Sequence, residues 1–408
     1  MTASMACADP TPNDAEGGTS ATETTTAAET STAAESSETT TDADATSDAG
    51  TTGDAETTGD GDGDGDGDGD PAPANYIFLT SEPRPAGSWG NVQTADSECA
   101  SLAAAAGLPD QAYMALLSGR ETPLRQRLAA TGARGWQRPD GRPVADTLDE
   151  LLGGGIAYPP RLDAVGEDLG SVFVGTGLDT NGDDAQTQNC SDFTVADTEL
   201  VAGGRASRGR RDFFSGDLVA CDVSTYTLCL GTSESVALGW DPFPSDPDEA
   251  RLAFVSAQTF KPEASEDALA DADALCQGEA TDAGFGDREF RALLATGQQS
   301  AASRFDLDGR AWRRADGVQL WSDATELPQI GALLAPIDRD AQGQAPTEER
   351  VWTGAVSPGD FGQGSTCGDW IDPAKFGRQG YAGQSSGFWF SSFNVQCNSS
   401  LRLYCLER

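Results

Sequence analysis

The sequence predicts an α+β protein that consists of two tandem units behind an N-terminal segment that does not fold. Three observations lead to this prediction: residues 1–74 almost lack apolar side chains other than alanine, eight of the nine cysteines lie in an internal repeat, and both copies show the same order of strand and helix patterns. Strands and helices that follow one another irregularly between long loops are typical of α+β domains, not of a parallel doubly wound sheet.

Residues 1–74 consist mainly of Thr, Ala, Glu, Asp, Gly and Ser and end in an alternating Gly-Asp run at 59–70. They carry 18 acidic residues and no Lys or Arg. Such a chain cannot bury enough apolar surface to offset its ordering entropy, and its charges repel one another. We therefore predict a disordered, extended acidic stalk. The alternative is that the Gly-Asp run binds calcium, which prefers carboxylate oxygens.

The internal repeat is clearest in the cysteines, which form two sets of four. The spacings are 91, 31 and 8 residues in the first set and 91, 30 and 8 in the second. The sets are Cys99, Cys190, Cys221 and Cys229, then Cys276, Cys367, Cys397 and Cys405. Matching intervals of this length indicate two copies of a unit of ordinary domain size.

The two copies share further landmarks. YMALLSG at 113–119 matches FRALLATG at 290–297, and VFVGTG at 172–177 matches VWTGAV at 351–356. Between the copies the chain is rich in proline and acidic residues, which indicates a linker. The predicted organisation is a stalk at 1–74, a first domain at 75–230, a linker at 231–250 and a second domain at 251–408.

Each unit is expected to open with a short strand, YIFLTS in the first and LAFVSA in the second. A helix follows. In TADSECASLAAAAGL the side chains of Cys99, Leu102 and Ala106 share one face, and Thr94 or Asp96 can cap the start. A second short helix is predicted over the ALL sequence of each unit. The unit closes with a strand, TYTLCL or LRLYCLE.

The cysteine pattern predicts disulfides. No two cysteines are separated by only two residues, so the pattern is not that of a zinc ribbon. Four matched cysteines in a loop-rich domain indicate two disulfides in each unit and an oxidising compartment. The alternative is buried, reduced thiols in a cytosolic protein. Spacing alone leaves three pairings open in each unit.

The ninth cysteine, Cys7, lies in TASMAC directly ahead of the stalk. A small residue before a cysteine that precedes a long polar tether resembles the end of a bacterial lipoprotein signal, so we predict lipidation of Cys7 and a membrane tether. The alternative is a stray thiol. Residues 1–15 lack the regions of a complete signal peptide, and we expect the true start to lie upstream. The predicted location is extracytoplasmic, as a cell-surface or outer-membrane lipoprotein, or alternatively as a secreted protein.

Composition excludes several classes of function. The net charge is −40, and nothing resembles the basic stripe that neutralises phosphates, so nucleic acid is not an expected partner. The chain has no histidine, which excludes Ser-His-Asp and Cys-His hydrolases and zinc sites that use histidine. No glycine-rich phosphate loop follows a strand. We therefore predict a protein that is not an enzyme and has no obligatory cofactor.

The motifs of the second unit resemble those of a known family. VWTG at 351–354, TCGDW at 366–370 and RLYCLE at 402–407 are similar to the bacterial endostatin-like domains related to the collagen NC10 region, which have the C-type-lectin-like fold. The first unit departs from the pattern, with VFVG, NCSDF and LCL in these places. The resemblance covers nearly all of both units and implies two tandem domains of this fold.

The resemblance also implies how the cysteines pair. The first cysteine of each set is expected to join the fourth, and the second to join the third. Carried over to this chain, the pairs are Cys99–Cys229, Cys190–Cys221, Cys276–Cys405 and Cys367–Cys397. The calcium motifs of sugar-binding C-type lectins do not occur here, so sugar binding of that type is not expected.

One loop has the spacing of a helix–loop–helix calcium site. In DRDAQGQAPTEE at 338–349, oxygen-bearing side chains fall at positions 1, 3, 5 and 12, and glycine falls at position 6. The candidate calcium ligands are Asp338, Asp340, Gln342 and Glu349. A proline inside the loop and the lack of a following amphipathic helix weaken the match, so we favour a solvated acidic loop.

Aromatic side chains in GFWFSSFN at 387–394 could form a ligand platform. The candidates are Phe388, Trp389 and Phe390, together with Trp370 of the TCGDW motif. We favour core packing next to a disulfide. Alternation along a strand would leave one side of this stretch exposed.

These observations predict a non-catalytic, extracytoplasmic recognition or adhesion protein. Two disulfide-linked domains on a flexible stalk would bind a glycan, a matrix component or a surface protein. The alternatives are a hydrolase or oxidase on the same scaffold, or a purely structural surface module.

Overall fold

The computed structural model describes residues 73–238, 250–263, 265–331 and 333–408. The predicted stalk, up to residue 72, and Cys7 lie outside the described residues. Residues 69–408 form one compact unit, in which we call 73–238 repeat 1 and 250–408 repeat 2. Within the described ranges, no helix is long and apolar enough to cross a membrane.

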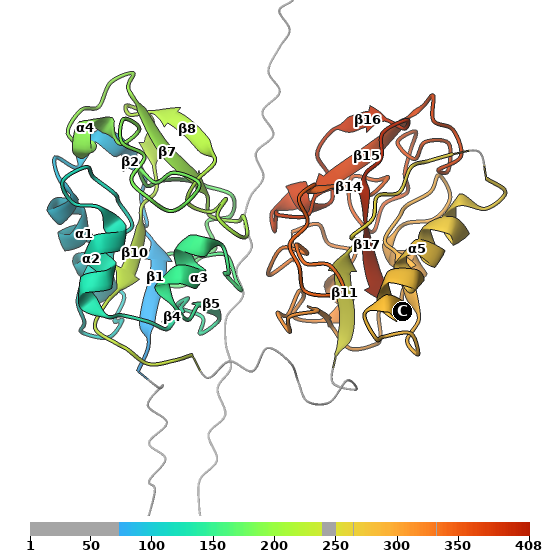
Figure 1. Cartoon of the computed structure of the whole chain (residues 1–408), viewed down its shortest axis with the longest axis horizontal. Coiled ribbons are helices and arrows are strands. Elements are labelled where there is room, and N and C mark those ends of the chain that lie inside the picture. The colour runs from blue at the N-terminus through green and yellow to red at the C-terminus, as the bar shows by residue number, and fades with distance from the viewer. Residues whose placement is uncertain (1–72, 239–249, 264, 332) are drawn as a thin grey trace, which may run out of the picture. The chain divides into compact units, whose positions relative to one another are not determined.

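Repeat 1 places its first and longest helix beside its main sheet (Figure 1). Its elements up to the middle of the repeat are β1 (Asn75–Leu79), β2 (Arg84–Pro85), η1 (Ala86–Ser88), α1 (Val92–Ala105), β3 (Tyr113–Ala115), α2 (Leu124–Thr131), β4 (Trp136–Gln137), β5 (Pro143–Ala145) and α3 (Leu148–Gly153). They are followed by β6 (Phe173–Gly175), α4 (Cys190–Phe193), β7 (Leu200–Arg205), β8 (Asp217–Ala220), β9 (Ser224–Thr225) and β10 (Leu228–Gly231).

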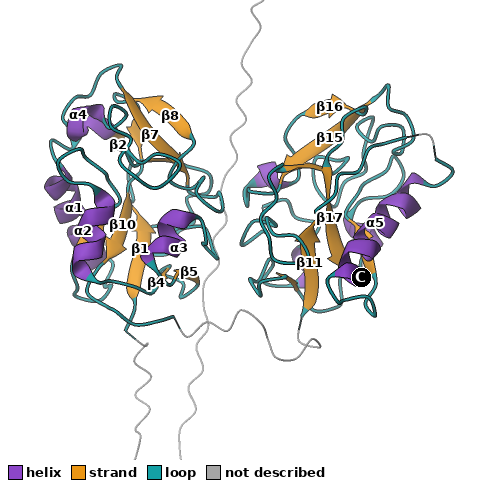
Figure 2. Ribbon diagram, in the orientation of Figure 1, coloured by secondary structure: helices purple, strands orange, loops and turns teal. Residues whose placement is uncertain are grey.

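The described part of repeat 2 keeps the order of the main strands but has fewer strands and helices than repeat 1, and long loops connect them (Figure 2). Its elements are β11 (Arg251–Val255), α5 (Ala268–Asp282), β12 (Phe290–Ala292), η3 (Ala302–Arg304), β13 (Trp312–Arg314), η4 (Ala324–Glu326), β14 (Arg350–Trp352), β15 (Phe376–Tyr381), η5 (Gly387–Trp389), β16 (Asn394–Gln396) and β17 (Arg402–Glu407). The mixture of helices with largely antiparallel sheets confirms the α+β class.

The closing strand of each repeat lies inside the main sheet, between the opening strand and the strand that ends in the ALL sequence. In repeat 1, Cys229 of β10 lies opposite Phe78 of β1 and Ala115 of β3. In repeat 2, Cys405 of β17 takes the same place between β11 and β12. All of these pairs are antiparallel, whereas β4 and β13 lie parallel to the opening strands. The last strand of the chain therefore lies in the core of repeat 2.

The ALL sequences form strand ends, so the prediction of a helix there is wrong. β3 and β12 end at the alanines of these sequences, Ala115 and Ala292, and both pair with the closing strand. Ala and Leu favour a helix when considered alone. Here, backbone pairing with a buried central strand outweighs that preference, because what decides strand formation is packing and pairing in the sheet.

The first helix also begins earlier than predicted. Asn91 caps α1, and its side chain accepts a hydrogen bond from the Thr94 amide at 2.8 Å. Asp96, one of the predicted caps, instead accepts the Ala115 amide at 2.8 Å and two bonds from Arg127 at 2.7 Å. This carboxylate therefore ties the helix to β3 and to α2.

The strands in the second half of each repeat correct the alignment of the two copies; they form a separate sheet in repeat 1 and part of the main sheet in repeat 2. β6 pairs with β7 through Val174 opposite Gly204, and β14 pairs with β15 through Val351 opposite Gly380. The register therefore matches VGTG at 174–177, not VFVG, with VWTG of repeat 2. Gly175 stands where repeat 2 has Trp352, and a Cβ at Gly175 would lie 2.9 Å from the Thr225 hydroxyl.

Each repeat contains two disulfides, which connect segments of that repeat. They are Cys99–Cys229, Cys190–Cys221, Cys276–Cys405 and Cys367–Cys397, the nested pairs that the resemblance implies. The first and third join the long helix of a repeat to its closing strand across about 130 residues of chain. All eight sulfurs belong to buried residues, and the bridges indicate an oxidising, extracytoplasmic environment.

The first part of the predicted linker belongs to repeat 1. The Glu234 amide donates to the Asn75 side chain at 3.0 Å, and the Leu238 amide donates to Asp146 at 2.9 Å. These bonds hold the chain against repeat 1 up to the last residue described before the gap at 239–249.

Candidate functional site

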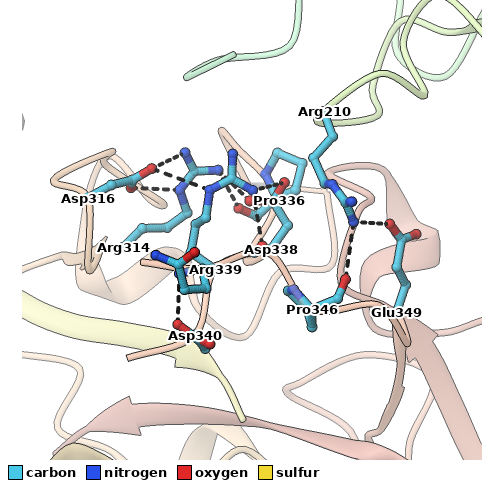
Figure 3. Close-up of polar contacts among 10 residues, drawn as sticks. Arg210, Arg314, Asp316, Pro336, Asp338, Arg339, Asp340, Pro346 and Glu349 are labelled. Atoms are coloured by element: carbon cyan, nitrogen blue, oxygen red, sulfur yellow. Dashed lines mark hydrogen bonds and ion pairs between the residues drawn. The ribbon is translucent and has the colours of Figure 1, made fainter. Parts of the chain in front are cut away.

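The predicted calcium loop is folded against the protein instead of lying in solvent. Asp338 is 2% exposed and Asp340 is 9% exposed, so the prediction of a solvated acidic loop is wrong for these two side chains. Oδ1 of Asp338 accepts a hydrogen bond from Nη1 of Arg314 at 2.7 Å (Figure 3). Arg339 lies 3.3 Å from its other oxygen. A buried carboxylate needs such cations, because leaving water is costly for a lone charge.

The other candidate ligands point to separate partners. Asp340 accepts the amides of Gln342 and Gln344, at 3.0 and 2.8 Å, and so closes its own turn. Gln342 is exposed. Oε1 of Glu349 pairs with Arg210 at 3.0 Å (Figure 3). Among the described residues, no three His, Cys, Asp or Glu side chains are grouped to hold a metal ion, and calcium binding stays a prediction.

The loop also lacks the helices of a calcium-binding helix–loop–helix. Over 333–349, which is described throughout, the chain forms turns and extended segments, and β14 follows at Arg350. Its counterpart in repeat 1 is the turn at Asp163, which accepts the Val165 and Glu167 amides in the same way. The shared turn explains the acidic residue at this place as a local structural element.

Of the four aromatic candidates, three belong to the core. Trp370, Trp389 and Phe390 are fully buried, whereas Phe388 is 54% exposed. The stretch is a 3-10 helix, η5, and not the alternating strand that was predicted. Its tight turn directs Trp389 inward, where Nε1 donates to the Ile330 carbonyl at 2.8 Å. Phe388 is left as the one candidate of this set that can meet a ligand.

In addition to the pair between Arg210 and Glu349, backbone hydrogen bonds join one segment of each repeat. The Gly209 amide donates to the Gly383 carbonyl at 3.0 Å, and the Ser385 amide donates to the Ser207 carbonyl at 3.0 Å. Arg161 of repeat 1 adds bonds to the Leu333 carbonyl at 3.1 Å and to the Ser385 hydroxyl at 3.0 Å. Arg161 is 7% exposed, so this contact excludes most water.

A cavity of about 620 Å³ opens beside this contact, and we call it the inter-repeat pocket. Its lining residues are Arg205, Arg208, Asp212, Gly216, Glu349, Tyr381, Gln384, Phe388 and Ser392. Two residues singled out in the sequence, Glu349 and Phe388, therefore meet in one place. A neighbouring cavity of about 460 Å³ shares Asp212 and Glu349 with it.

The pocket carries balanced charge. Arg205 and Arg208 both pair with Asp217, at 3.3 and 3.1 Å. Burial raises the pKa of the Asp212 carboxyl above its ordinary value, although Arg208 and Arg210 oppose the shift. Burial likewise raises the pKa of Glu349, and the nearby charge of Asp212 adds to the effect. The walls thus present two cationic and two anionic side chains together with neutral polar and aromatic groups.

Sequence reasoning missed most of this pocket, although one signal was present. Four arginines lie within seven residues at 205–211, in a chain whose net charge is −40. A local basic cluster in such a chain indicates carboxylate partners or a ligand. The second signal is the internal repeat, because it aligns Asp212, the residue directly after this cluster, with Phe388, which had been chosen as a platform residue.

Comparison with known proteins adds no assignment. The chain matches no protein-family model, and no curated protein matches it significantly. Function is therefore argued from the geometry and chemistry of the pocket.

Replacing Asp212 by asparagine is expected to stabilise the fold at neutral pH. A carboxyl whose pKa is raised in the folded state binds more protons there than in the unfolded chain, so stability falls as pH rises above about 4. Asp217 and Asp338 face Asp212 with like charge, and Arg208 and Arg210 only partly compensate. The urea midpoint of the Asp212→Asn variant should exceed that of the wild type at pH 7, and the gap should narrow as pH falls below about 4.

Asp222→Asn is the matched control, because Asp222 is exposed on the same repeat. The urea midpoint of Asp222→Asn should equal that of the wild type both at pH 7 and below about pH 4. A lower midpoint for Asp212→Asn at pH 7 would show that the arginines outweigh the cost of burial and would contradict the raised pKa.

Proposed function

We propose that this protein is a non-catalytic recognition protein that acts outside the cytoplasm. In this proposal both repeats are endostatin-like domains of the C-type-lectin-like fold, and lipidated Cys7 and the acidic stalk hold them away from a membrane as a surface lipoprotein. The nested disulfides and the closing strand inside each main sheet support the fold assignment. The ligand is a glycan, a matrix component or another surface protein.

One observation carries this proposal: the inter-repeat pocket combines an exposed aromatic ring with several hydrogen-bonding side chains on a rigid scaffold. Its volume of about 620 Å³ lies within the ordinary range of ligand sites. An exposed aromatic residue loses little entropy on binding and offers a large contact area. Backbone hydrogen bonds from Cys221 to Glu199 and from Cys367 to Phe376 connect two of the disulfides to the starts of β7 and β15, which carry part of the lining and limit the ordering cost at binding.

The test is a binding screen with the full oxidised chain. The labelled protein is applied to arrays of glycans, extracellular matrix proteins and bacterial surface proteins, beside the same protein after reduction. Specific binding that reduction abolishes is the expected result, because the pocket depends on the disulfide-bonded fold. Absence of saturable binding on all three arrays would contradict a recognition role and favour a purely structural module.

The arrangement of Asp212 and Glu349 favours one second candidate, a hydrolase. Both carboxyls line both cavities, and burial raises the pKa of each, as is common for acid–base groups. A panel of chromogenic glycosides separates the candidates. A hydrolase would lose turnover in Asp212→Asn and Glu349→Gln variants, whereas the recognition protein shows no turnover in any form.

A further inference from the structure

The lining of the inter-repeat pocket follows the internal repeat. Eight of its nine lining residues form four pairs, and the two members of every pair are separated by 176 positions in the sequence. The pairs are Arg205 and Tyr381, Arg208 and Gln384, Asp212 and Phe388, and Gly216 and Ser392. Glu349 is the only lining residue without such a counterpart in the pocket.

The members of these pairs occupy equivalent places in the fold. Arg205 ends β7 opposite Phe173, and Tyr381 ends β15 opposite Arg350, so the strand registers agree. Gly203 lies opposite Asp217, and its counterpart Gln379 exchanges backbone hydrogen bonds with the chain at 392–393. The paired lining residues therefore occupy equivalent backbone positions in the two repeats, and their constant spacing is not a coincidence.

The contact between the repeats has the same symmetry. The amide of Gly209 bonds to the carbonyl of Gly383, and the amide of its counterpart, Ser385, bonds to the carbonyl of Ser207. The two bonds are reciprocal, with Arg208 opposite Gln384 in an antiparallel bridge. Reciprocal contacts between identical surfaces are what a two-fold axis produces. The inter-repeat pocket thus lies at an approximate two-fold axis that relates the repeats.

The chemistry of the two halves differs although their backbones correspond. Repeat 1 contributes two arginines, an aspartate and a glycine, whereas repeat 2 contributes a tyrosine, a glutamine, a phenylalanine and a serine. One wall is therefore charged and hydrogen-bonding, and the facing wall is neutral and aromatic. Neither repeat alone contains both kinds of wall.

We propose that the inter-repeat pocket binds one neutral saccharide unit of a glycan, with the ring face on Phe388 and the hydroxyls toward Arg208, Asp212 and Gln384. This inference rests on the proposed recognition function and specifies its ligand. A sugar has an apolar face of C–H groups and an edge of hydroxyls that both donate and accept hydrogen bonds. Such a molecule needs one aromatic wall and one wall with donors and acceptors together.

Charge favours a neutral saccharide over an acidic one. The two lining arginines are balanced by Asp212 and Glu349, and both also pair with Asp217. An anionic sugar would bring its charge next to two half-buried carboxylates without a free cation to offset them. A neutral ring meets no such cost. Because the pocket lies at the axis, the stoichiometry is one saccharide for each chain and not one for each repeat.

The test measures glycan binding by the full chain and three variants. Phe388→Ala removes the aromatic ring that would carry the sugar, and Ser392→Trp fills the pocket while Phe388 stays in place. Phe376→Ala is the matched control, because Phe376 is 50% exposed on the same repeat and does not line the pocket. Near-ultraviolet circular dichroism checks that each variant keeps the native fold. The probes are arrays of neutral and of sulfated or sialylated oligosaccharides, followed by calorimetry with the best neutral oligosaccharide.

The expected result is binding to neutral glycans with a stoichiometry near one, a loss of at least tenfold in affinity for Phe388→Ala and Ser392→Trp, and less than twofold change for Phe376→Ala. Preference for acidic glycans, two sites for each chain, or unchanged binding in Phe388→Ala and Ser392→Trp would overturn the inference. Binding only to matrix or surface proteins would overturn it while leaving the recognition role intact. No binding on any array would overturn both.

Discussion

Replacing Cys276 and Cys405 together by alanine is expected to lower the free energy of unfolding of repeat 2 by about 5 kcal/mol, because this bridge closes a loop of 129 residues in the unfolded chain. The same change at Cys367 and Cys397, which are 30 residues apart, should cost about 3.5 kcal/mol. The longer bridge costs more because it removes more conformational freedom from the unfolded state.

Urea unfolding followed by tryptophan fluorescence measures both effects. Five of the eight tryptophans lie in repeat 2, so the signal reports mainly on that repeat. The corresponding double replacement at Cys99 and Cys229 in repeat 1 is the control and should leave most of this transition in place. Equal losses for the long and short bridges of repeat 2, or a larger loss for the short one, would contradict the chain-entropy explanation.

Replacing Arg314 by alanine is expected to destabilise repeat 2 by about 3–5 kcal/mol, because it leaves the buried carboxylate of Asp338 and the half-buried one of Asp316 without their main cation. Arg314 is 1% exposed and bonds to Asp338 at 2.7 Å and to Asp316 at 2.7 and 2.9 Å. Burial alone would lower the pKa of Arg314, but these two acids raise it above its ordinary value. Arg314 likewise holds the pKa of Asp316 below its ordinary value despite burial.

Two further variants test this reading of the ion pair by urea unfolding. Arg313→Ala, on the same strand, makes no side-chain bond in the described part of the chain and should change stability by less than about 0.5 kcal/mol. Arg314→Met combined with Asp338→Leu should recover most of the loss, because it removes both fully buried charges and leaves Asp316 and Arg339, which lie 3.9 Å apart, to pair with each other. A double variant as unstable as Arg314→Ala would show that packing, not charge, explains the effect.

Repeat 1, which is described throughout, has no counterpart of the ion pair between Arg314 and Asp338, so the internal repeat could not predict that pair. Arg138 and Asp140 reproduce the pair formed by Arg314 and Asp316, and the Arg138 side chain bonds to the Pro159 carbonyl as Arg314 bonds to that of Pro336. Two residues after these prolines, repeat 1 has Arg161 where repeat 2 has Asp338. Asp338 pairs with Arg314 of its own repeat, whereas Arg161 donates a hydrogen bond to the Leu333 carbonyl of the other repeat.

Much of the fold could be predicted because it depends on covalent or short-range patterns. Cysteine spacing located both repeats, and the opening and closing strands occur where YIFLTS and LRLYCLE were interpreted as strands. The helix over ALL was wrong because a three-residue segment carries too little periodicity to distinguish a helix from a strand that pairs with a distant partner. The predicted N-cap of the first helix was wrong for Asp96, because its carboxylate accepts hydrogen bonds from the Ala115 amide and from Arg127 instead.

The candidate site was predicted only in part, because its residues come together from distant parts of the chain. Phe388 and Glu349 were chosen separately, as a platform residue and as a calcium ligand, and no local pattern relates them. Their neighbours Arg208 and Asp212 come from the other repeat, about 140 positions before Glu349 and about 180 before Phe388. Burial decided which aromatic candidates can meet a ligand. Trp389 and Phe388 are adjacent in sequence, yet Trp389 is fully buried and Phe388 is exposed.

The sequence by itself determined that the chain contains two related, cysteine-linked α+β units and that chemistry based on histidine is excluded. Those conclusions need only composition and spacing. The tertiary structure alone decided which equivalent positions face each other. The contact between Ser207–Gly209 and Gly383–Ser385 places the charged half of one repeat against the aromatic half of the other. Such a juxtaposition comes from long-range packing, which leaves no periodic signal along the chain.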